Sequence, residues 1–169
     1  MVFSTAARLT ADDAQAEDIA QEVFLRAYAQ FEQLRTSPTA GGWLKTVATN
    51  LTLNHLTRYR RRRRLFSELA AAAGDADPAE PDMPLPDRLL ADIGLAQRRA
   101  VIDSALRQLP ERQRVPLVLH HFEEMSYEEI ARRLNASLAK VKTDIRRARL
   151  KMLPLLQSAG ISRDSLVED

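Results

Sequence analysis

The sequence predicts an all-α fold in which two small helical domains are joined by a flexible acidic linker. Apolar residues recur at three- and four-residue steps in both halves of the 169-residue chain, as they do in amphipathic helices. Aromatic residues make up only 5% of the chain and there are five glycines. Alanine, leucine, arginine and glutamate are abundant, and these residues cost least in a helix. Strand signals are absent, so we expect helices in both domains.

Residues 70–87 mark the linker, because they hold four prolines and several acids without any apolar periodicity. This composition is typical of a tether between domains and not of a core element. We therefore predict a first domain at residues 1–67 and a linker at residues 68–92. A second domain follows at residues 93–157, and a tail at residues 158–169.

Charge is arranged in alternating blocks, although the formal net charge is only +2. Residues 11–33 carry six acids against one arginine, and residues 68–92 carry seven acids against one arginine. By contrast, residues 58–64 hold six arginines around one tyrosine, and residues 137–151 hold six basic residues against one aspartate. The two basic blocks predict two separate surfaces that bind a polyanion.

Several classes of protein are excluded by composition. The chain has no cysteine, which rules out disulfides and thiolate metal sites. No apolar run approaches the roughly 18 residues of a membrane span, and the N-terminus lacks the pattern of a secretory signal. Three histidines are scattered, and neither a glycine-rich phosphate loop nor metal-ligand spacing is present. We therefore expect a soluble cytoplasmic protein that is not an enzyme, with no catalytic residue, metal or cofactor.

The first domain is expected to contain two main helices separated by a break at Thr36–Gly42. The first helix should bury a face formed by Ala20, Val23, Phe24, Ala27, Tyr28 and Phe31. A polar stripe on the same helix consists of Asp18, Gln21, Glu22 and Leu25. This stripe is either a plain solvated face or a docking surface for a protein with a basic groove. The second helix should start near Trp43 and bury Leu44, Val47, Ala48 and Leu51. It is expected to continue into Arg58–Arg64. The alternative interpretation of this arginine run is a solvated helix end or a disordered tail.

The second domain is expected to contain four helices, the first at about residues 89–109. The next follows Pro110, and Pro116 inside it should shift its start or kink it. A capping box of Ser126 and Glu129 predicts the start of the third helix, and Asn135 suits the following turn. Ser137 should cap the last helix, which buries Val141, Ile145, Ala148 and Met152.

These last two helices form a predicted helix-turn-helix. Ala131 allows the two helices to cross closely, and Val141 sets their angle. The outward face of the second helix suits a DNA major groove and carries Lys140, Lys142, Thr143, Arg146, Arg147 and Lys151. The alternative is an ordinary helical hairpin with a solvated basic face.

Four segments resemble motifs of one known family, and they occur in the same order. Residues 16–27 (AEDIAQEVFLRA) and 42–50 (GWLKTVATN) are similar to motifs of domain two of RNA polymerase sigma factors. Residues 109–114 (LPERQR) and 126–131 (SYEEIA), with the VKT and RAR segments of the last helix, resemble motifs of sigma domain four. Domain three is missing between them, so the resemblance is to the extracytoplasmic-function (ECF) group.

The resemblance implies a protein that binds core RNA polymerase, directs it to promoters and promotes promoter melting. The implied partners are the clamp helices of the polymerase largest subunit, the polymerase flap, promoter DNA as duplex and as melted non-template strand, and an anti-sigma factor. Core binding would fall on Asp18, Gln21, Glu22 and Leu25. Minus-ten binding would fall on Trp43, Asn50, Asn54, Arg58, Arg60 and Arg61, with the loop Arg35–Gly42 helping to capture a flipped base. Minus-thirty-five binding would fall on Ser137, Lys140, Lys142, Thr143, Arg146 and Arg147.

Three departures from the family pattern are visible. Relatives have another helix before the Val2–Leu9 segment, so domain two is expected to be short at its N-terminus. Asp144 stands where a basic residue is common, and should repel phosphate unless it bonds a cytosine or pairs with Lys140 or Arg147. Lys140 itself replaces a small hydroxyl residue.

Two other functions remain as alternatives. One is a stand-alone transcriptional regulator that uses the helix-turn-helix, which leaves the Asp18–Leu25 stripe without a role. The other is a truncated sigma-like protein that only titrates an anti-sigma factor.

Overall fold

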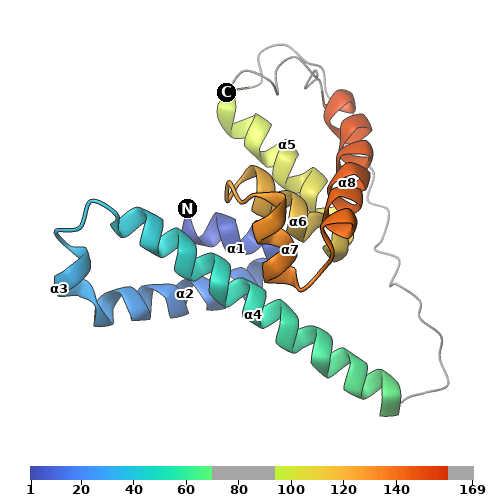
Figure 1. Ribbon diagram of the computed structural model, residues 1–169. Coiled ribbons are helices and arrows are strands. Elements are labelled where there is room, and N and C mark those ends of the chain that lie inside the picture. The colour runs from blue at the N-terminus through green and yellow to red at the C-terminus, as the bar shows by residue number, and fades with distance from the viewer. Residues whose placement is uncertain (70–93, 160–169) are drawn as a thin grey trace. The chain divides into compact units, whose positions relative to one another are not determined.

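The computed structural model describes residues 1–69 and 94–159, and every regular element in these ranges is an α-helix (Figure 1). The predicted all-α class is thereby confirmed. The helices belong to two compact units, one within Met1–Pro81 and one within Asp82–Asp169. Most of the predicted linker and the tail from residue 160 lie outside the described residues.

The first unit is built from three long helices, α1 (Val2–Thr10), α2 (Asp13–Ala29) and α4 (Ala40–Leu69), which all contact one another (Figure 1). A short helix, α3 (Phe31–Leu34), connects α2 to α4. Alanines from all three long helices lie fully buried in the core, among them Ala6, Ala16 and Ala48. Small side chains at a helix crossing let the backbones approach closely and so keep this small core closely packed.

The α1–α2 turn is held by side-chain hydrogen bonds. The Thr10 hydroxyl donates to the backbone carbonyl of Ala6 at 2.9 Å and accepts from the backbone N–H of Asp12 at 3.2 Å. Asp12 then caps α2, because its Oδ1 accepts from the backbone N–H of Gln15 at 3.0 Å. The bonds to the backbone N–H groups of Asp12 and Gln15 satisfy donors that the start of α2 leaves without partners.

The prediction that the first helix buries its aromatic side chains is wrong. Val23 is buried, but Phe24, Tyr28 and Phe31 expose 57%, 82% and 55% of their surface. The face that packs against α1 and α4 instead consists of small and aliphatic residues, namely Ala16, Ile19, Ala20 and Val23. Phe31 does not belong to α2 at all, since that helix ends at Ala29.

Helix α4 begins at Ala40, three residues before the predicted start, so that Gly41 and Gly42 lie in its first turn and not in a loop. The Trp43 backbone N–H donates to the Thr39 carbonyl at 2.9 Å, which places Trp43 inside the first turn. The expected apolar face is confirmed, because Ala48 is buried and Leu44, Val47 and Leu51 pack against the core. The helix then continues through the arginine run to Leu69, as expected.

The second unit consists of α5 (Leu95–Arg107), α6 (Glu111–His121), α7 (Tyr127–Leu134) and α8 (Leu138–Ser158). Its core draws large aliphatic side chains from all four helices, including Leu106, Val118, Ile130 and Ile145. Helix α6 begins directly after Pro110 and runs through Pro116, so the internal proline does not shift its start.

Both caps predicted around the helix-turn-helix are present. The Ser126 hydroxyl accepts from the Glu129 backbone N–H at 3.2 Å, and the Glu129 carboxylate accepts from the Ser126 backbone N–H at 2.8 Å. The bonds from Ser126 hold the pKa of Glu129 below its ordinary value. Asn135 adopts the left-handed conformation with φ of 50°. Ser137 caps α8 by accepting from the Lys140 backbone N–H at 3.3 Å.

A polar contact joins the end of α6 to α8. The Arg149 guanidinium donates to Nε2 of His121 from Nη2 at 2.9 Å and from Nε at 3.2 Å. His121 can accept these bonds only as a neutral imidazole. Desolvation, together with the neighbouring Arg149 and His120, lowers the pKa of His121 to about 4.

The capping box predicts the effect of one substitution on stability. Ser126→Ala removes the hydroxyl that caps α7 and should lower the free energy of unfolding by about 1 kcal/mol. Urea denaturation followed by circular dichroism measures the change. Ser126→Thr keeps the hydroxyl and is the matched control, so an equal loss in both variants would show that the cap is not the cause.

The His121–Arg149 contact predicts a pH dependence. His121 titrates near 6.5 in the unfolded chain and at about 4 in the folded one, so the unfolded state binds more protons between these values. The free energy of unfolding should therefore be intact above pH 6.5 and fall as the pH drops towards 4. In His121→Gln the amide oxygen accepts from Arg149 without titrating, and its urea midpoint should fall less between pH 6.5 and 5. Identical pH profiles would contradict the assignment.

Candidate nucleic-acid and protein interfaces

Helix α8 has one buried face and one exposed basic face. Its buried side chains include Val141, Ile145, Ala148 and Met152, which anchor it to the second unit. The residues predicted to contact the minus-thirty-five element are all exposed, and they are Ser137, Lys140, Lys142, Thr143, Arg146 and Arg147. Two of their hydroxyls already have partners, because Ser137 caps the helix and Thr143 donates to the Ala139 carbonyl at 2.8 Å. The five residues of this set that belong to α8 thus lie on its exposed side, and Ser137 lies at its N-terminal end.

Asp144 does not lie on the exposed basic face. Its side chain is only 8% exposed, and its Oδ2 accepts from Nζ of Lys140 at 2.8 Å. Of the partners considered from sequence, Lys140 is the one that the structure shows. Periodicity gave a clue to this burial, since residue 144 lies three positions after Val141 and four before Ala148, in the register of the buried face.

Helix α4 presents the residues predicted to contact the minus-ten element. Trp43 and Asn50 are half-buried, whereas Asn54, Arg58 and Arg60 are exposed. Trp43, Asn50 and Asn54 follow one another at intervals of seven and four residues, so they lie along one stripe of the helix. Arg61 lies on the same helix, but its side chain is outside the described ones.

Only residues 35–39 form the connection between α3 and α4. The predicted base-capturing loop Arg35–Gly42 is therefore shorter than expected. A hydrogen bond of 2.9 Å joins the hydroxyls of Ser37 and Thr39 within it.

The polar stripe of α2 is exposed along its whole length. Asp18, Gln21 and Glu22 all face solvent, and Leu25 exposes 70% of its surface. Glu22 forms a surface ion pair of 2.6 Å with Arg26, one turn later. Exposed pairs of this kind contribute little to stability, so Glu22 remains able to exchange Arg26 for another cation.

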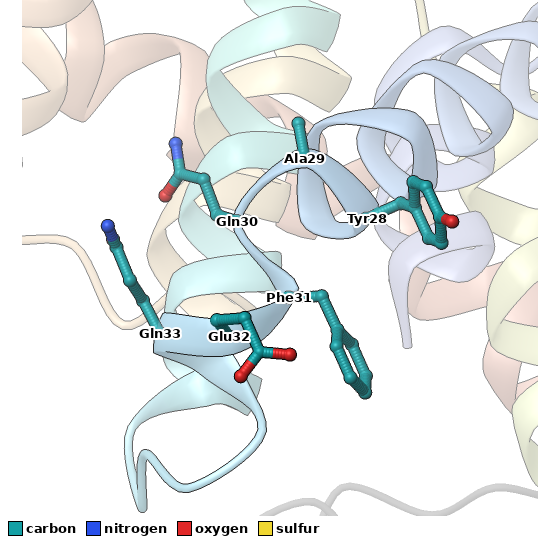
Figure 2. A pocket seen from close by; sticks show the side chains of 6 residues that line it. All are labelled: Tyr28, Ala29, Gln30, Phe31, Glu32 and Gln33. Carbon is teal, nitrogen blue, oxygen red and sulfur yellow. The ribbon is translucent and has the colours of Figure 1, made fainter.

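An exposed aromatic surface lies beside this stripe and was missed by the sequence analysis. Phe24, Tyr28 and Phe31 form it, and an open hollow of about 320 Å³ is lined by residues 28–33. The rings of Tyr28 and Phe31 project on one side of the α2–α3 junction and the amides of Gln30 and Gln33 on the other (Figure 2). The three- and four-residue spacing of these rings with Ala20, Val23 and Ala27 predicted that they would be buried.

The described residues contain no helix long and apolar enough to cross a membrane. Across the same residues, no group of three or more histidine, aspartate or glutamate side chains is placed to hold a metal ion.

Two family descriptions match separate parts of the chain. Residues 1–63 match Sigma-70 region 2, and residues 99–152 match region 4 of Sigma-70. The first match covers α1 to most of α4, and the second runs from within α5 to most of α8. The two matches therefore contain the polar stripe of α2, the stripe of α4 and the basic face of α8.

Similar proteins support the same assignment. RNA polymerase sigma-H factor of Pseudomonas aeruginosa is 34% identical over 160 residues, covering 90% of this chain and 80% of its own. The ECF sigma factor SigW of Bacillus subtilis is 30% identical over 150 residues, covering 88% and 79%. The fold is also similar, with a TM-score of 0.51, 20% identity and coverage of 92% and 89%, to sigma factor RpoE solved with anti-sigma factor NepR from Bartonella quintana. The chain belongs to the extracytoplasmic-function subfamily of RNA polymerase sigma factors, which direct polymerase to promoters at the start of transcription.

Proposed function

We propose that this sigma factor divides its work among three helices. Helix α2 binds core polymerase, α4 binds the minus-ten element, and α8 binds the minus-thirty-five element. The two units act as sigma domains two and four, within residues 1–67 and 93–157, on either side of a linker at residues 68–92. The observation that carries the proposal is the exposed face of α8, where cationic side chains are presented from a capped helix whose opposite face is buried.

Minus-thirty-five recognition is assigned to the helix-turn-helix. In this motif the N-terminal part of the second helix approaches base edges in the major groove. Lysine and arginine side chains there bind phosphates or the acceptors of guanine. Lys142, Arg146 and Arg147 project from α8 as this role requires, while Ile130 and Val141 hold the helix against α7 from the buried side.

Minus-ten recognition is assigned to α4 and the α3–α4 connection. A base flipped out of its stack costs a few kcal/mol, which contacts with the flipped base must offset. The half-buried Trp43 and Asn50 offer an apolar ring and an amide, and Asn54 extends the same stripe. Arg58, Arg60 and Arg61 then follow on the same helix and bind upstream duplex phosphates. Capture of a single-stranded base couples recognition to melting.

Core binding is assigned to Asp18, Gln21, Glu22 and Leu25 on α2. This stripe combines acids with one exposed leucine, which suits a partner surface that is basic and partly apolar. We propose that the partner is the pair of clamp helices of the polymerase largest subunit, with the flap as a second contact and the cytoplasm as the place of action. An anti-sigma factor is a further proposed partner, since RpoE of Bartonella quintana was solved with NepR.

Reversal of charge at Glu22 tests the core-binding stripe. Glu22→Lys places a cation against the proposed basic partner surface, and should weaken binding to core polymerase by about 100-fold. The ion pair with Arg26 is solvent-exposed, so the fold should persist. Glu17→Lys makes the same charge change about 140° away from Glu22 around α2 and is the matched control. Unchanged core affinity of the Glu22 variant, measured by fluorescence anisotropy, would contradict the proposed role.

Truncation of Arg147 tests the minus-thirty-five surface. Arg147→Ala should weaken binding to a promoter duplex by about 1–3 kcal/mol and relax the preference at one base pair. Competition binding against a set of single-base promoter variants measures both effects. An equal loss on every sequence would assign Arg147 to a phosphate.

Core pull-down combined with run-off transcription separates the alternatives. A sigma factor must bind core polymerase and initiate at specific promoters. A stand-alone regulator would bind duplex without core polymerase, whereas a decoy would bind an anti-sigma factor without supporting transcription.

A further inference from the structure

The basic face of α8 begins with a lysine whose charge is already neutralised. Lys140 lies in the first turn of the helix, three residues after the cap Ser137. Its ammonium donates to Asp144 at 2.8 Å, and the two side chains are 56% and 8% exposed. Asp144 is therefore held in place by its burial, and Lys140 lies over it at the surface.

Two physical effects favour this pairing. The first turn of a helix is the positive end of its dipole, where a lysine is unfavourable unless an anion is near. A buried carboxylate, in turn, is costly without a hydrogen-bonded cation. Asp144 thus offsets the unfavourable position of Lys140 at the positive end of the helix, and Lys140 offsets the cost of burying the Asp144 carboxylate. Together the two side chains contribute almost no net charge to the electrostatic field around α8.

A paired ammonium behaves differently from a free one beside DNA. A free lysine side chain can bind a DNA phosphate, and the neutralised phosphate releases counterions. Each such contact adds about 0.9 to the salt slope, which is the fall in log affinity per unit of log salt concentration. A lysine held by a neighbouring carboxylate contributes little to this term. Two of its three N–H donors remain available, and its position is fixed before DNA arrives, so little conformational entropy is lost on binding.

We propose that Asp144 is a positioning residue for DNA recognition, which holds Lys140 as a base-reading donor instead of a phosphate-binding charge. The inference rests on the proposed role of α8 at the minus-thirty-five element. Lys140 occupies the end of the helix that approaches base edges in a helix-turn-helix. The acceptors O6 and N7 of guanine are the groups that such a donor binds.

Salt dependence of binding to a random-sequence duplex tests the electrostatic part. We compare the full-length wild type, Asp144→Asn, and the double variant Lys140→Gln/Asp144→Asn by anisotropy between 0.05 and 0.2 M salt. Asp144→Asn frees the lysine and should steepen the slope by about 0.9, so that its affinity changes about 3.5-fold more than that of wild type over this range. The double variant, which has no charge at either position, should keep the wild-type slope.

Selection from duplexes randomised over the minus-thirty-five region tests base reading. Wild type should enrich guanine at one position, and both Lys140→Gln and Asp144→Asn should lose that enrichment. Lys140 is largely exposed, so its variant tests the proposal even if Asp144→Asn fails to fold. Equal salt slopes for wild type and Asp144→Asn, or an unchanged consensus in Lys140→Gln, would overturn the proposal. Absence of duplex binding by wild type would overturn the role of α8 as well, which distinguishes the two failures.

Discussion

The burial of one side of α8 is the constraint on which the DNA-binding surface depends. Val141, Ile145 and Ala148 lie in the core of the second unit, and Ile130 of α7 packs into the same core. Because these side chains cannot leave the core without exposing apolar surface to water, α8 cannot rotate about its axis. The exposed cations consequently keep one direction, and the caps at Ser126 and Ser137 set where the helices around the turn begin.

In the first unit, too, buried side chains fix the orientation of a helix that carries exposed cations, although the core is smaller. Buried alanines let α1, α2 and α4 approach closely, and Leu56 is the last buried residue of α4 among the side chains described. The helix continues for more than three turns beyond that point, to Leu69, and about 45 Å separate its two ends. One helix therefore serves as part of the core in its first half and carries the arginine run in its second half.

Much of the architecture was predictable because it depends on local chemistry. The capping box, the left-handed Asn135, the Ser137 cap and the apolar repeat of α8 need only neighbouring residues, and each was confirmed. The start of α4 was misplaced because two glycines suggested a turn, although they lie in a helix that packing stabilises. The proposed site residues follow the same division: their helices, the exposed face of α8 and the Ser137 cap were predictable, whereas the choice of Lys140 over Arg147 as the partner of Asp144 needed the tertiary structure.

The sequence by itself determined the all-α class, the four helices of the second unit and the family, because these depend on helical periodicity and on motifs read along the chain. Only the tertiary structure decided that α2 buries Ala16, Ile19, Ala20 and Val23, leaving Phe24 and Tyr28 in solvent. It also decided that Asp144 is buried beneath Lys140. Both outcomes depend on which surfaces of other helices lie opposite, and that information is not contained in the repeat of a single helix.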